Sequence, residues 1–206
     1  MKPLYYLAVD IGASSGRHML ATYNDGKMTL EEVYRFENGM DDDNGKKTWD
    51  TDRLFKEIIS GMIQCKKIGK VPVSMSIDTW AVDYVLLDDK DRRIGDAYGY
   101  RDSRTDNIEN EVYKIISEES LYKRTGIQKQ KFNTIYQLMA DKIKEPERLK
   151  NAKTFLMLPD YFQFLLTGLK ASEYTNATST QLVDPHTKQW DYELIDMLKL
   201  PRDIFG

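Results

Sequence analysis

The chain has 206 residues and a formal net charge of -3, with no basic block, so nucleic acid is disfavoured as its main partner. This length allows one large domain or two small ones, with a substantial hydrophobic core. No apolar run approaches 18 residues and no signal peptide is evident, so neither a membrane span nor export is expected. Cys65, the one cysteine, fits a cytoplasmic protein without an internal disulfide.

The first predicted element is a buried strand over residues 5–9, which ends at Asp10 and then turns sharply through small residues. Five consecutive apolar residues are typical of a strand that is buried on both faces. In the turn, Gly12 and Gly16 allow positive φ and close approach of a ligand to the backbone. The sequence therefore predicts a glycine-containing ligand loop directly after the first strand.

Hydroxyl groups make this loop a candidate phosphate site. Ser14 and Ser15, with neighbouring amides, can donate to phosphate oxygens, and Asp10 can hold a hydrated Mg²⁺. The loop is neither a Walker A motif, since no Gly-Lys-Ser/Thr follows, nor a dinucleotide fingerprint, since the glycine spacing differs and a strand comes next. An ordinary tight turn is the alternative. The two hydroxyls together with Arg17 favour a phosphate.

Three antiparallel strands are predicted to open the domain. The second strand covers residues 18–23, and an Asp-Gly turn at 24–27 leads to the third strand over residues 28–36. The next segment, residues 38–47, is polar and contains three consecutive aspartates. Because its glycine and glutamate are out of register for a calcium loop, a solvated loop is expected there.

A crossover helix then leads to a parallel strand. Apolar residues at helical spacing predict the helix over residues 51–68, and a strand over residues 71–77 follows. This strand ends at Asp78, just as the first ends at Asp10. Strands joined by a crossover helix are parallel, so we expect the two aspartates to lie side by side and to open onto one cleft.

The remaining elements are mostly helices. They are a strand over 84–87, helices over 106–118, 120–125 and 134–144, a strand over 154–158, and helices over 160–166 and 192–198. The fold class predicted from this order is α/β, a ribonuclease H-like (actin-like ATPase) fold. Its mixed sheet opens with an antiparallel three-strand meander and is flanked by helices.

Two further stretches, residues 78–83 and 100–104, place aromatic rings beside carboxylates and a guanidinium group. Sugars suit this mixture, because their apolar faces pack on rings while their hydroxyls pair with Asp and Arg. The alternative is structural, with Trp80 in the core, the aspartates capping turns, and Arg101 and Asp102 forming a surface pair.

Two aspartate-tipped strands admit two kinds of chemistry. Phosphoryl transfer from a nucleotide would use the serine-containing loop for phosphates. Two-metal hydrolysis of nucleic acid would need three or four carboxylates around the metal ions. The inward face of the first helix offers no convincing third carboxylate, and the chain offers no line of basic residues to bind the nucleic-acid strand. A third possibility is a sugar- or nucleotide-binding module without chemistry.

The motifs point to a family. They are AVDIGASSGR (8–17), RFENG (35–39), TWD (48–50), SIDTWAVDYVLL (76–87), YRDSRT (100–105), FNTIYQL (132–138), LMLPDYF (156–162), LTG (166–168) and EYTNATSTQLV (173–183). In these motifs, and in their order along nearly the whole chain, the protein resembles the N-terminal domain of the FGGY family of carbohydrate kinases, in particular the rhamnulokinase group.

The resemblance implies ATP-dependent, Mg²⁺-assisted phosphorylation of the ketose L-rhamnulose at its 1-hydroxyl, in rhamnose catabolism. It implies a metal position near Asp10. It implies a nucleotide-phosphate loop made of Ala13, Ser14, Ser15, Gly16 and Arg17. The substrate-binding residues implied by these motifs and their loops are Trp80, Ala81, Asp83, Arg101, Asp102 and Asn133.

The chain also departs from the family. A glycine often stands where this chain has Ala81, and Lys and Trp often stand at Gln137 and Ala140. Family members place the general-base aspartate beyond Gly206, where a second domain completes the ATP site. Residues 1–206 are therefore expected to be the substrate-side domain of a longer kinase, with no catalytic residue of their own. Alone they are expected to be inactive, because general-base catalysis contributes roughly 10²–10⁴-fold.

Overall fold

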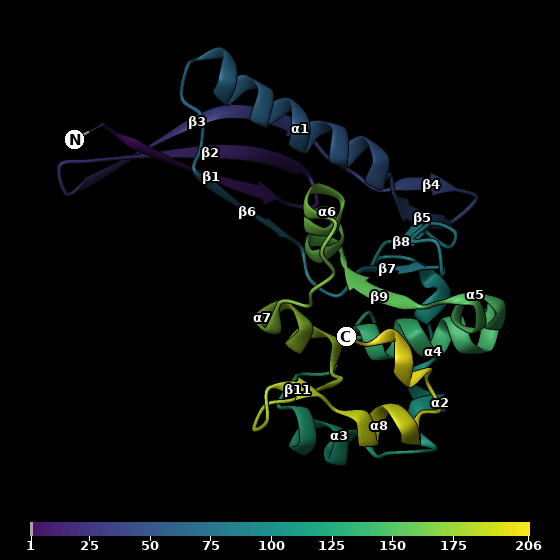
Figure 1. Ribbon diagram of the computed structural model, residues 1–206. Helices are drawn as coiled ribbons and strands as arrows, with labels where there is room; N and C mark the ends of the chain where they lie inside the picture. The colour runs from purple at the N-terminus through teal and green to yellow at the C-terminus, as the bar shows by residue number, and fades with distance from the viewer. Residues whose placement is uncertain (1) are drawn as a thin grey trace. The chain divides into compact units, whose positions relative to one another are not determined.

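The computed structural model describes residues 2–206, and Figure 1 shows their helices and strands. The chain divides into two compact units. The first runs to Asp41 and resumes over Trp49–Trp80, and the second contains Asp42–Thr48 and Ala81–Gly206. No helix within residues 2–206 combines the length and apolar character that a membrane crossing requires.

A four-stranded sheet forms the first unit, in the order β3-β2-β1-β6. Strands β1 (Leu4–Ile11), β2 (Ser15–Asn24) and β3 (Lys27–Glu37) are antiparallel neighbours. Strand β6 (Ser74–Thr79) pairs with β1 in parallel, after the crossover helix α1 (Thr51–Lys67). The predicted meander, helix and parallel strand are confirmed, and Figure 1 shows α1 along the sheet.

Helix α1 packs through an apolar face that includes Leu54 and Ile58, and Asp50 caps its first turn by accepting a hydrogen bond from the Arg53 N–H at 2.8 Å. His18 lies fully buried beneath it, with Nε2 3.2 Å from the Ile58 carbonyl oxygen. Burial lowers the pKa of His18, so the neutral ring is favoured. Gly61 makes room for this ring, because a Cβ there would lie 2.2 Å from it.

Short strands recur in the second unit. Strands β7 (Tyr84–Leu87) and β9 (Thr154–Met157) pair antiparallel. A three-stranded sheet has the order β4-β5-β8, and a two-stranded sheet pairs β10 with β11. The bounds of these strands are β4 (Asp41–Asp43), β5 (Lys46–Trp49), β8 (Ala97–Tyr98), β10 (Val183–Asp184) and β11 (Gln189–Trp190).

The prediction of a solvated loop at residues 38–47 is wrong in part. Strands β4 and β5 form there, and the Gly99 N–H donates to the Lys47 carbonyl at 2.8 Å, just after β8. The side chains of β4 are exposed, as the polar sequence suggests. Strand β4 pairs with β5, and β5 in turn pairs with β8, a segment about 50 residues away in sequence that local residue patterns do not reveal.

Helices make up most of the second unit. They are α2 (Glu109–Tyr113), α3 (Glu118–Thr125), α4 (Thr134–Lys144), α5 (Pro146–Asn151), α6 (Leu158–Thr167), α7 (Tyr174–Ala177) and α8 (Tyr192–Met197), with 3₁₀ turns η1 (Ser103–Thr105), η2 (Thr178–Thr180) and η3 (Arg202–Ile204). The helix predicted over 106–118 is shorter, because Asn107 has a positive φ of 65° and Ser117 already caps α3.

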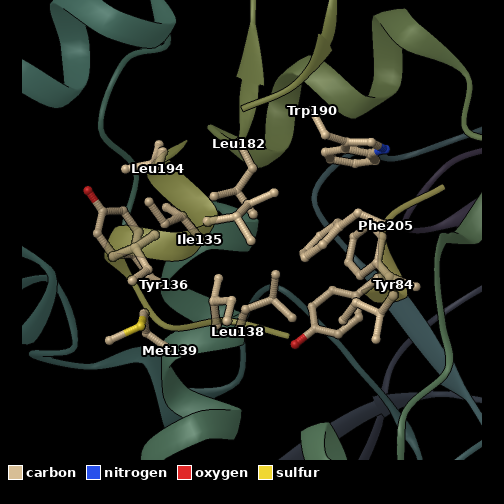
Figure 2. Close-up of a cluster of buried hydrophobic side chains, with 14 of the residues drawn as sticks. Tyr84, Ile135, Tyr136, Leu138, Met139, Leu182, Trp190, Leu194 and Phe205 are labelled. Carbon is tan, nitrogen blue, oxygen red and sulfur yellow. The ribbon is translucent and has the colours of Figure 1, made fainter. Parts of the chain in front are cut away.

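The core of the second unit surrounds α4, and Figure 2 shows part of it. Ile135 and Leu138 of α4 lie among side chains from β7, β11 and the C-terminal segment, including Tyr84, Trp190 and Phe205. These residues are at least nine-tenths buried. The C-terminal segment is therefore an integral part of this core.

Candidate active site

The carboxyl ends of β1 and β6 bring two aspartates together in the first unit. Asp10 and Asp78 are register partners in the parallel pair, so their side chains leave the same face of the sheet. Their neighbours Val9 and Ile77 are buried on the opposite face. The predicted adjacency of the two acid-tipped strands is confirmed.

On the opposite edge of β1 from β6, Arg17 of β2 is the antiparallel register partner of Asp10. Its Nε and Nη2 both donate to Asp10 Oδ2, at 2.9 and 2.8 Å. Both side chains are nearly half exposed, at 49% and 44%, so the pair remains accessible to a charged ligand. Such a pair contributes only about 0–1 kcal/mol to stability, which leaves it available for ligand binding.

The acidic groups at these strand ends suit Mg²⁺. Within residues 2–206 no cluster of three or more His, Cys, Asp or Glu side chains could hold a metal by itself. Mg²⁺ does not require one, because it keeps several waters and commonly binds one or two carboxylates plus substrate phosphates. The adjacent Asp10 and Asp78 carboxylates match that requirement.

The turn after β1 is held closed by Asn38. The Asn38 N–H donates to the Ser14 carbonyl at 2.9 Å, and its side-chain amide donates to the Gly12 carbonyl at 2.8 Å. Arg53 of α1 in turn donates to Asn38 Oδ1 at 3.0 Å. Asn38 belongs to the RFENG motif, and sequence reasoning assigned it no role. The Asn38-Gly39 pair directly after the third strand was the sequence feature that could have indicated this role.

The two glycines of this turn have ordinary negative-φ backbone conformations. Neither Gly12 nor Gly16 uses the positive φ that glycine allows. Gly16 lies within β2 and is the register partner of Ile11 and Phe36. A Cβ at Gly16 would lie 2.1 Å from the Phe36 ring, so glycine is required here by packing. In the same turn Ala13 is half-buried and Ser14 is exposed.

Trp80 follows β6, and its ring stacks on Trp49 with centroids 3.8 Å apart and planes inclined by 31°. Trp49 is buried and Trp80 is half-buried. The indole of Trp80 thus has a structural contact within the first unit. Its predicted contact with a sugar stays a prediction.

In the second unit, residues Ala81–Asp83 form a tight turn. Val82 has a φ of +69°, and the Asp83 N–H donates to the Ala81 carbonyl at 3.0 Å. Ala81 is exposed, whereas Asp83 is fully buried. The Asp83 carboxylate accepts hydrogen bonds from Gln137 Nε2 at 2.9 Å and from the Tyr100 N–H at 3.0 Å. The buried side chain of Asp83 therefore orders the turn.

The other predicted sugar residues of the second unit divide by exposure. Arg101 is exposed, with its guanidinium 5.3 Å from the Tyr100 ring centroid. Asp102 is buried and accepts hydrogen bonds from the Lys47 and Arg104 N–H groups, both at 2.7 Å. Asn133 is buried too, and its side-chain amide donates to the Gln128 carbonyl at 3.0 Å.

These contacts give Asp102 and Asn133 structural roles. Sugar binding by Arg101, Asp102 or Asn133 stays a prediction.

Sequence reasoning singled out Arg101 and missed Arg104. The Arg104 side chain is 10% exposed and forms an ion pair with the fully buried Asp141. Asp141 also accepts a hydrogen bond from Tyr84 Oη at 2.6 Å, and Arg104 Nη2 donates to Gln137 Oε1 at 2.9 Å. Arg104 belongs to the same YRDSRT motif. Only the packing of α4 distinguishes it from Arg101.

Asp160, in the LMLPDYF motif, is 3% exposed, and its two oxygens lie 3.3 Å from the Glu173 nitrogen. Burial raises the pKa of Asp160 from 3.8 to about 7, and the charge on Glu173 adds to the increase. The folded protein therefore retains a proton that the unfolded chain releases above pH 4. The resulting stability is fully present below pH 3.8 and is lost as pH rises through 7.

We expect Asp160→Asn to raise the melting temperature at pH 8, because the amide cannot ionise. The increase should shrink towards pH 4, where Asp160 is protonated in the native protein. Asp184→Asn is the matched control, because backbone N–H groups lower the pKa of Asp184 and its loss should reduce stability at pH 8. Thermal denaturation from pH 4 to 8 gives both profiles. Parallel profiles for Asp160→Asn and the wild type would contradict the assignment.

The fold of this chain matches that of solved sugar kinases, which have the actin-like ATPase fold. Gluconate kinase from Lactobacillus acidophilus matches with a TM-score of 0.84 at 21% identity, over 98% of this chain and 41% of that one. Xylulose kinase from the same organism matches with a TM-score of 0.82 at 22% identity, over 97% and 40%. These likenesses establish the fold, as predicted.

Residues 5–206 match the model of the FGGY family of carbohydrate kinases, N-terminal domain, and the chain belongs to this family. It is 55% identical to a rhamnulokinase from Halalkalibacterium halodurans over 201 residues, which are 98% of this chain and 43% of the relative. It is 42% identical to a rhamnulokinase from Bacillus subtilis, over 98% and 41%. The chain thus spans less than half the length of these curated relatives.

Proposed function

We propose that residues 1–206 are the substrate-side domain of an ATP-dependent kinase that phosphorylates L-rhamnulose at its 1-hydroxyl, in cytoplasmic rhamnose catabolism. The family supports a sugar kinase, and relatives up to 55% identical carry the name rhamnulokinase. The observation that carries the proposal is the pairing of Asp10 with Asp78 beside the Gly12–Arg17 turn.

The first unit would bind the nucleotide phosphates. The phosphate-contacting residues we propose are Ala13, Ser14, Ser15, Gly16 and Arg17. The half-exposed guanidinium of Arg17 can attract a phosphate, and the exposed Ser14 hydroxyl can donate to one. When bound near Asp10, Mg²⁺ would neutralise charge on the transferring phosphoryl group. The turn held by Asn38 would keep these groups in position before the nucleotide binds.

The ketose would contact residues that the motifs place after the second acid-tipped strand. Trp80 can offer an aromatic surface, and Ala81 and Arg101 are accessible to a ligand. The buried Asp83, Asp102 and Asn133 would act by shaping the loops around the sugar. We place the general base, and the remainder of the ATP site, outside residues 1–206.

The test compares two proteins: residues 1–206 alone and the protein translated from its full coding sequence. ATP-dependent phosphorylation of L-rhamnulose, L-fuculose and L-xylulose is measured for both, with calorimetric titration of the same sugars. We expect the full protein to favour L-rhamnulose and residues 1–206 to turn it over negligibly. Sugar binding by the full protein without turnover would instead support a binding module. Comparable rates for the two proteins would refute the placement of the general base.

A further inference from the structure

The outer side of β3 is an open strand edge. β3 stands at one end of the sheet order β3-β2-β1-β6, and over Lys27–Glu32 no backbone hydrogen bond joins its outer side to another segment within residues 2–206. Every residue from Lys27 to Glu32 is exposed. An open edge of this kind can pair with a strand of another molecule unless charges, a bulge or a cover prevent it.

The turn before β3 determines which backbone groups point outward. Its two central residues have φ of +48° and +77°, as in a type I′ turn, and the pair Asn24–Lys27 closes it. Opposite residues of an antiparallel pair alternate in their bonding, so every second residue from Lys27 onward bonds to β2. Between them, Met28 and Leu30 therefore direct their N–H and C=O groups away from β2, to the open edge.

The two faces of this edge differ in character. Glu31 is the register partner of the buried Leu20 and pairs with Lys70, which follows α1, so it lies on the helix side of the sheet. Met28 and Leu30 lie on the other side and are 60% and 65% exposed. In Figure 1 the β2–β3 hairpin extends past the end of α1. The edge thus offers apolar side chains on one face and charged ones on the other.

One register suits a second copy of the same strand. A two-fold axis through Thr29 places Met28 opposite Leu30 of the second copy, and their outward backbone groups can then exchange both hydrogen bonds. The same axis places Lys27 opposite Glu31. Moving the axis to Leu30 removes this pair of opposite charges, and moving it to Glu31 places two like charges opposite each other. Charge complementarity therefore selects the axis through Thr29.

A β-bulge limits how far such a pairing can extend. Glu32 is paired with Met19 and Tyr34 with His18, so Val33 has no register partner and the regular part of β3 ends at Glu32. The paired residues 27–31 lie wholly within this regular part. Because the paired segment is short, the contact area is small, and the association is expected to be weak and dependent on concentration.

We propose that residues 27–31 of β3 form a self-association surface, through which two copies of the protein join their sheets edge to edge as a weak two-fold dimer. Met28 and Leu30 make the apolar contacts, and Lys27 and Glu31 make the ionic ones. The proposal rests on the edge of the first unit and is independent of the function proposed above.

The test is sedimentation equilibrium of the full protein at micromolar to submillimolar concentrations, where we expect a reversible dimer. Lys27→Glu places two carboxylates opposite each other at both ends of the pairing and should raise the dissociation constant about 10-fold. The double variant Lys27→Glu, Glu31→Lys restores opposite charges with their positions exchanged, so its constant should return close to that of the wild type. Lys123→Glu, the matched control, makes the same charge change on the exposed surface of α3 and should leave the constant unchanged.

Three results would overturn the proposal. The first is a wild type that stays monomeric over the whole concentration range. If residues 1–206 alone then self-associate, the remainder of the longer chain covers the edge in place of a second copy. The second is a dimer with the same dissociation constant in the wild type and in Lys27→Glu, which would place the contact on another surface. The third is a double variant as weak as Lys27→Glu, which would exclude the register centred on Thr29.

Discussion

Asp10→Asn is expected to lower the kcat of the full kinase about 10²-fold or more, with little change in the KM for the sugar. The substitution removes the carboxylate that we place beside the metal and the nucleotide phosphates, where charge in the transition state must be balanced. Steady-state kinetics over a range of Mg²⁺ concentrations measure the effect. Part of the loss should be recovered at high Mg²⁺, because weaker metal binding contributes to it.

Asp78→Asn, at the other carboxylate of the proposed Mg²⁺ site, is the comparison for this experiment. It makes the same change of charge on the neighbouring strand and the same sheet face. Its effect on kcat should be smaller, because Asp10 and not Asp78 pairs with Arg17 of the phosphate turn. Equal losses in the two variants would contradict a specific role for Asp10 and point to the total charge of the strand ends.

The largest loss of stability is expected from Asp141→Asn, by about 3–5 kcal/mol. Asparagine has nearly the same volume but leaves the enclosed guanidinium of Arg104 without its counter-charge. Burial raises the pKa of Tyr84, so its hydroxyl stays protonated and can still donate to an amide oxygen. The loss should therefore come mainly from the ion pair. Urea denaturation, followed by tryptophan fluorescence and circular dichroism, measures it.

An exposed ion pair provides the comparison. Glu119→Gln removes the partner of Lys123 in α3, where both side chains are more than 70% exposed, and should change stability by about 0.5 kcal/mol or less. The double variant Arg104→Met, Asp141→Leu should be more stable than Asp141→Asn, since it removes the Arg104 charge together with its partner. Similar losses for Asp141→Asn and Glu119→Gln would contradict the buried ion pair.

Local patterns were sufficient for the first unit because its elements are long and regular. The Asp-Gly hairpin, the helical spacing of Leu54 and Ile58, and the two acid-tipped strands each predict an element that the structure contains. The adjacency of Asp10 and Asp78 follows from the connection alone, since a single crossover helix joins their strands.

Features that depend on partners distant in sequence were not predictable. Strands β4 and β5 are polar and short, and they join a sheet in which β5 pairs with the distant β8. Gly16 is required by the Phe36 ring and not by its own φ, and no local pattern contains that contact. Arg101 and Arg104 are indistinguishable as residue types, yet one is exposed and the other is enclosed by α4.

Because residues 42–48 belong to the second unit while both flanking stretches belong to the first, the polypeptide passes between the units three times. Neither unit is a contiguous gene segment. A chimera that exchanged residues 81–206 with those of a relative would leave the 42–48 hairpin facing a foreign β8 strand. Recombination between related kinases should therefore give folded hybrids more often when this hairpin is exchanged along with the later segment.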